Sequence, residues 1–148
     1  MPDLEVLKRR YLAMNDARPI PANVLDEITS ELGLQLPDDF HKIGMFFDGG
    51  GIHVMALHSL SGNSPKLNPV SETLRLRSAI GLPPNWLVLG EPPGSLLLMD
   101  CAAGGRVIWI DATDVERIGS QSLMRQPDSW NSFAEFFAYL LDEEEEDR

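Results

Sequence analysis

The chain has 148 residues, enough for one domain that buries about two-thirds of its unfolded surface without a metal or disulfide. Its formal net charge is −11 and it shows no cluster of Lys and Arg, so direct nucleic-acid binding and attachment to anionic membranes are not expected. The single cysteine, Cys101, excludes an intramolecular disulfide and favours a cytoplasmic location, and no signal peptide or membrane-spanning run is recognised.

Three helices are predicted in the first third of the chain. Apolar residues at helical spacing predict an amphipathic helix over residues 3–15. Pro21 suits the first turn of a second helix, and Gly33 suits its C-terminal cap. Pro37 repeats the same start signal, and a third apolar face follows from Phe40.

The next segment of the chain is predicted to contain a sharp turn, a strand, a loop and a short helix. Phe46 and Phe47 run into three consecutive glycines at 49–51, which predicts a turn from helix into a strand near 52–58. Residues 59–68 are rich in Ser, Gly, Asn and Pro and are expected to form a loop. A short helix is predicted from Pro69, with its apolar stripe on Val70, Leu74 and Ile80, ending at Gly81.

The second half of the chain is expected to form a sheet and a closing helix. Residues 86–89, 95–99 and 106–110 read as short strands, and their short connections favour antiparallel pairing. The Ser132-x-x-Glu135 pattern is a capping box that opens a final helix. The order of helices, strands and helix predicts an α+β fold with a single domain over residues 1–141. The acidic residues 142–148 are expected to be a disordered tail.

No catalytic, metal or cofactor site is recognised. His41, His53 and His58 have no metal-ligand spacing, and Cys101 follows an acid that would raise its pKa. Asp100 and Asp111 are one alternative, because they could face each other across a hairpin and support acid/base chemistry or a divalent cation. The stronger alternative is that both are turn residues at strand ends.

Several motifs together resemble the SUKH superfamily, the Smi/Knr-like proteins, over about residues 18–141. Each motif is weak alone, but their order and spacing are specific. The segments are residues 20–21, 36–40, 47–50, 82–88, 94–100, 107–111 and 132–136. The resemblance implies a curved, mainly antiparallel sheet with flanking N-terminal and C-terminal helices. It also implies a binding function without catalytic residues.

The residues that match shared motif positions are interpreted as mainly structural. They are Pro37, Phe47, Gly49, Gly50, Trp86, Gly94 and Asp100. The family usually has Asn-Gly-Gly where this chain has Asp48-Gly49-Gly50. Because Asp and Asn both suit turns, the fold is expected to tolerate the change, although a neutral amide contact would be lost.

The resemblance implies a non-enzymatic immunity protein that occludes a cognate polymorphic toxin, such as a basic nuclease or deaminase domain. A regulatory or scaffold module that binds another protein is the second hypothesis. A small-molecule binder or enzyme using Asp100, Asp111 and the Gly-rich region is the third. The acids expected to meet a basic partner lie at predicted element ends, where loops usually carry function: Asp38, Asp39, Asp48 and Glu91. Neither the oligomeric state nor the identity of the partner follows from the sequence.

Overall fold

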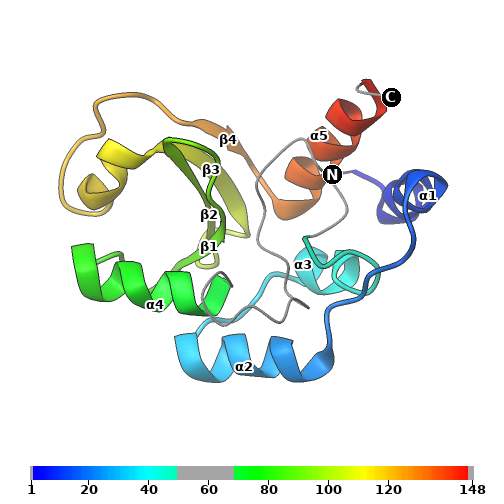
Figure 1. Cartoon of the computed structure of the whole chain (residues 1–148), viewed down its shortest axis with the longest axis horizontal. Coiled ribbons are helices and arrows are strands. Elements are labelled where there is room, and N and C mark those ends of the chain that lie inside the picture. Colours follow the sequence, from blue (N-terminus) through cyan, green and yellow to red (C-terminus); the bar gives the residue numbers. More distant parts are fainter. Residues whose placement is uncertain (1, 50–68, 147–148) are drawn as a thin grey trace.

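The computed structural model describes residues 2–49 and 69–146 (Figure 1). Gly50 and the expected strand at 52–58 lie outside these residues. The described elements, in chain order, are α1 (Leu4–Met14), α2 (Ala22–Leu32), α3 (Asp38–Ile43), α4 (Pro69–Ile80), β1 (Trp86–Gly90), β2 (Ser95–Asp100), β3 (Arg106–Asp111), the 3-10 helix η1 (Ala112–Arg117), β4 (Asp128–Trp130) and α5 (Phe133–Glu146).

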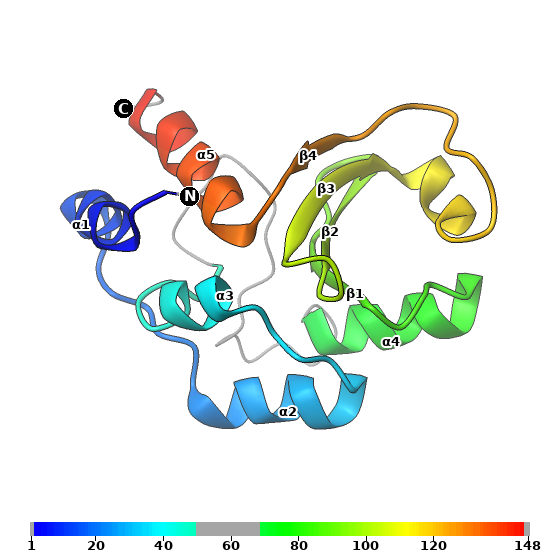
Figure 2. The same cartoon turned by 180° about the vertical axis from the view of Figure 1, so that it is seen from behind.

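The described strands form an antiparallel sheet in the order β1-β2-β3-β4. The strands curve, and helices flank the sheet from both ends of the chain (Figure 2). The expected α+β fold with a curved antiparallel sheet is therefore confirmed. The short strand β4 and the helix η1 were not anticipated, since neither carries a long apolar pattern.

Both faces of the sheet are buried. Side chains alternate between the faces of a strand, so neighbouring residues enter different hydrophobic clusters. The first cluster joins one face to α1, α2, α3 and α5, and its strand residues are Leu87, Leu89, Leu97, Met99 and Val107. The second joins the other face to α4 and η1, and its strand residues are Trp86, Val88, Leu96, Leu98, Ile108 and Ile110.

An aromatic cluster fixes the helices on the first face. The Tyr11 ring of α1 lies 5.4 Å from the Phe47 ring and 5.9 Å from the Phe137 ring of α5, measured between centroids. Phe47 and Phe137 are themselves 4.8 Å apart. Such offset pairs stabilise a core beyond the area they bury. The cluster thus joins both ends of the chain to the segment before the glycine run.

On the second face, a buried hydroxyl connects α4 to β1. The Oγ1 of Thr73 donates to the carbonyl of Pro69 at 2.6 Å and accepts the N–H of Val88 at 3.0 Å. Thr73 is completely buried. The helix therefore supplies an acceptor for a backbone N–H of β1, which is the end strand of the described sheet.

The last helix is longer than expected. It continues to Glu146, so residues 142–146 are helical and not part of a disordered tail. Acids at a helix C-terminus oppose the helix dipole, and Arg10 of α1 offsets this. Its Nη2 lies 2.6 Å from Asp142 Oδ1, and its Nε donates to Glu145 Oε1 at 2.7 Å. A contact between two ends of the chain is not visible in the charge pattern of the tail alone.

We expect Thr73→Val to lower the free energy of unfolding by about 2 kcal/mol, because the Val88 N–H would be buried without an acceptor. Thr29→Val is the matched control. Thr29 also donates to the carbonyl four residues earlier, but it is exposed and accepts no N–H of a described residue. Urea unfolding of both variants measures the difference, and equal losses would contradict the role given to Thr73.

Candidate functional site

The four candidate acids are placed in different environments. Asp38 is exposed at the start of α3, whereas its neighbour Asp39 is buried. Asp48 is buried after α3, and Glu91 is half-buried in the connection between β1 and β2. Because α3 packs on α5 while Glu91 meets α4, the structure does not bring these acids together as one surface.

Asp39 has a structural contact that connects two helices. Its Oδ2 accepts the N–H of Ala134, in the first turn of α5, at 2.8 Å. A carboxylate at a helix N-terminus satisfies a free N–H and complements the helix dipole. Only 6% of Asp39 is exposed, so the contact leaves little of its side chain for a partner.

Asp48 is held within the turn that it begins. Its Oδ1 lies 3.3 Å from Nε of Arg18, whose backbone N–H donates to the carbonyl of Phe46 at 2.8 Å. Burial, followed by the nearby charge of Asp48, raises the pKa of Tyr11. With Asp in place of Asn, this position carries a charge that Arg18 balances.

The described motif residues also make structural contacts. Phe47 and Trp86 are buried in the two opposite clusters. The ring of Pro37 packs so closely on Gly105 that a Cβ there would lie 2.9 Å from Pro37 Cγ. The Oδ1 of Asp100 accepts from Asn85 Nδ2 at 2.8 Å and from the Ala102 N–H at 3.0 Å.

Two motif glycines lie at turns where the backbone adopts a positive φ. Gly49 has a φ of 100° and Gly94 a φ of 73°, a region that other residues rarely adopt. Gly50 lies outside the described residues.

The expectation that Asp100 and Asp111 could face each other is wrong. The register pairs Asp100 with Arg106 and Asp111 with Ser95, so the two acids lie at opposite ends of the β2–β3 hairpin. Asp111 instead caps η1. Hydrogen bonds from the backbone and hydroxyl of Thr113 lower its pKa.

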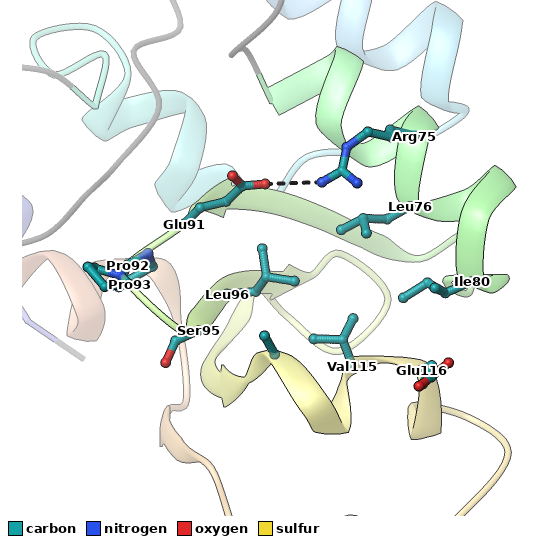
Figure 3. Close-up of a pocket in the computed structure, with 12 residues that line it drawn as sticks. Arg75, Leu76, Ile80, Glu91, Pro92, Pro93, Ser95, Leu96, Val115 and Glu116 are labelled. Carbon is teal, nitrogen blue, oxygen red and sulfur yellow. Dashed lines mark hydrogen bonds and ion pairs between the residues drawn. The ribbon is translucent and has the colours of Figure 1, made fainter.

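A groove of about 470 Å³ lies between α4, the β1–β2 connection and η1 (Figure 3). Three aliphatic side chains, Leu76 of α4, Leu96 of β2 and Val115 of η1, point into the same space. Glu91 lies at one end of this space and Glu116 at the other. The groove therefore has an apolar floor and acidic ends.

One guanidinium group is shared between two carboxylates at the end of the groove where Glu91 lies. Arg75 Nη2 lies 2.6 Å from Glu72 Oε2 and 3.4 Å from Glu91 Oε1. Burial raises the pKa of Glu91, and the adjacent carboxylate of Glu72 raises it further, while Arg75 acts in the opposite direction. The closer contact of Arg75 is thus with Glu72, and Glu91 is the less fully compensated acid.

Of the residues that line this groove, only Glu91 and Gly94 are among the predicted binding and motif positions. It placed Leu74 on the apolar stripe of α4, but the structure exposes Leu74 and buries Thr73 and Leu76. A stripe that includes Thr73 gives Val70, Thr73 and Leu76 at spacings of three, which is also compatible with one helix face. The sequence does hold that signal, although a polar residue interrupts it.

The described residues show no arrangement typical of catalysis. No group of three or more His, Cys, Asp or Glu among them could hold a metal ion. Burial, together with the charge of Asp100, raises the pKa of Cys101 to about 12, which disfavours a nucleophilic thiolate. None of the described helices is both long and apolar enough to cross a membrane.

Comparison with known families gives a match over most of the chain. The sequence profile of the SMI1 / KNR4 family (SUKH-1) matches residues 19–139, which include every described element except α1 and the last residues of α5. Comparison with curated proteins finds no match.

We expect Asp39→Ala to lower the free energy of unfolding by about 2 kcal/mol, because the buried Ala134 N–H loses its acceptor. Asp38→Ala removes the same charge from the exposed neighbouring position and should change stability by less than about 0.5 kcal/mol. Thermal or urea unfolding compares the two variants. A loss for Asp38→Ala as large as that for Asp39→Ala would show that general charge near α3, and not the contact with α5, matters.

We expect the Cys101 thiol of the folded protein to react with iodoacetamide at pH 8 about 10³-fold more slowly than the same thiol in urea. The reason is that a pKa of about 12 leaves correspondingly little thiolate. Mass spectrometry of timed samples gives both rates. Equal rates in the two states would contradict the burial of this side chain.

Proposed function

Because the chain belongs to the SMI1 / KNR4 family (SUKH-1), we propose that it is an immunity protein that neutralises a cognate polymorphic toxin by occluding it. Domains of this family are known as protein-binding domains of the immunity type and are generally non-catalytic. The match over residues 19–139 is the observation that carries the proposal. The partner is a basic toxin domain, such as a nuclease or deaminase, and the encounter takes place in the cytoplasm.

The arrangement of acids supports a binding role more than a chemical one. Asp39 stabilises a helix and Asp100 stabilises a turn. Asp100 and Asp111 lie at opposite ends of their hairpin and do not form a pair. The acids that remain accessible are spread over the surface, where they act on an approaching partner through their field. Such fields mainly increase the rate of association and select for a basic partner.

The direct test is survival of cells that express the toxic domain encoded beside this gene, with and without the protein. Rescue is the expected result. The control is a toxin variant without its activity, which must leave growth unchanged whether or not the protein is present. If cells die although the toxin is active and both proteins are soluble, immunity to that toxin is excluded, and a regulatory protein-binding module becomes the better hypothesis.

We expect the association rate constant of the protein with that toxin to fall by about tenfold between 50 and 500 mM NaCl, because the net charge of −11 attracts a basic partner. Stopped-flow fluorescence at each salt concentration measures this rate. The dissociation rate is expected to change much less. An association rate that is independent of salt would contradict the electrostatic part of the proposal.

A further inference from the structure

The groove between α4, the β1–β2 connection and η1 combines two chemical features that one kind of side chain can satisfy together. Its floor is aliphatic, and its ends carry carboxylates (Figure 3). Lys and Arg have the same division, because an aliphatic stem carries a cationic head. Aspartate and glutamate lack the long stem, and purely aliphatic side chains leave the carboxylates without a partner.

The floor of the groove offers apolar surface, whose removal from water is favourable. Leu96 and Leu76 are 7% and 6% exposed, and Val115 is 3% exposed, so they form a packed base and not mobile surface groups. Ile80 extends this base towards Glu116. A stem lying over these side chains would bury apolar surface on both sides.

The charges at the groove favour a cation. Among the described residues that line it, Glu91 and Glu116 are acids and Arg75 is a base. The guanidinium group of Arg75 lies closer to Glu72, at 2.6 Å, than to Glu91, at 3.4 Å. Burial is the largest cause of the raised pKa of Glu91, and the carboxylate of Glu72 raises it further. A second cation near Glu91 would therefore meet an attractive field.

We propose that this groove receives a Lys or Arg side chain of the partner protein, with the stem over Leu76, Leu96 and Val115 and the cationic head at Glu91 or Glu116. The inference rests on the proposed protein-binding function and names the chemistry of the contact. Arg in a well-packed pocket is among the anchors that dominate protein interfaces. The groove thereby gives the diffuse acidity of the protein one specific point of contact.

The groove can be tested without the partner by titrating the full-length, ¹⁵N-labelled protein with two small probes. N-acetyl-lysine methylamide carries the stem and the charge, and N-acetyl-norleucine methylamide carries a stem without charge. We expect the lysine probe to shift the amide resonances of Gly94, Ser95 and Leu96 and to bind about fivefold more tightly than the norleucine probe.

The double variant Glu91→Gln/Glu116→Gln should remove the preference for the lysine probe and leave the weak binding of the norleucine probe. Glu27→Gln/Glu31→Gln is the matched control, because both residues are exposed on α2, lie outside the groove and change the net charge equally. The control should retain the preference. Glu116→Gln alone, an exposed substitution, should reduce the preference partly and tests the groove if the double variant is destabilised.

Three results would overturn the inference. The lysine probe could fail to shift these amides at saturating concentration, both probes could bind equally, or the α2 control could lose the preference as fully as the groove variant. The rescue assay separates this outcome from failure of the proposed function. If a groove variant at limiting expression rescues cells as well as the wild type does, the role of the groove is rejected and immunity is retained. Lysine binding without rescue would retain the groove and reject immunity to that toxin.

Discussion

The burial of both faces of the sheet is the constraint on which the rest of the structure depends. Leu97 and Leu98 are adjacent in β2 and both are inaccessible to solvent, although they point to opposite sides. Each face therefore needs its own cover. Helices α1, α2, α3 and α5 provide it on one side, and α4 with η1 provides it on the other. The helices at both ends of the chain thus complete a core that the strands alone would leave open to water.

The helices must also be held in a defined orientation on the sheet and on one another. Buried polar groups contribute to this orientation. Hydrophobic contact is non-directional, whereas a buried hydrogen bond has a defined geometry. Thr73 fixes α4 to β1, Asp39 fixes α3 to α5, and Asp114 accepts the N–H groups of Met124 and Arg125 from the loop after η1. Some of the acids of the chain thereby stabilise the fold from inside it. A count of acids consequently overstates the negative charge available to a partner.

The helices and central strands could be predicted from the sequence because local signals determine them. Apolar periodicity located α1 and the three strands of the meander, and Gly33 ends α2 with a φ of 67°, as a left-handed cap requires. The exposure of individual acids could not be predicted, since Asp38 and Asp39 are adjacent and differ only in what α5 brings near them. The separation of Asp100 from Asp111 could have been predicted from the sequence. Both residues end their strands, and the C-terminal ends of two successive antiparallel strands lie at opposite ends of the hairpin.

The groove could not be predicted from the sequence, because three separate segments, residues 75–80, 91–96 and 112–116, form it and no local pattern shows that they meet. Its position follows from the same constraint as the fold. The short helix η1 has six residues and covers its face of the sheet together with α4, while α1, α2, α3 and α5 cover the opposite face around an aromatic cluster. Where α4 and η1 separate, Leu96 at the start of β2 is the base of a concave surface instead of a sealed core. The concave apolar site thus lies on the face of the sheet that only α4 and η1 cover among the described helices. Glu91 and Glu116 lie at the ends of that site, where they remain in contact with water and are accessible to a cation.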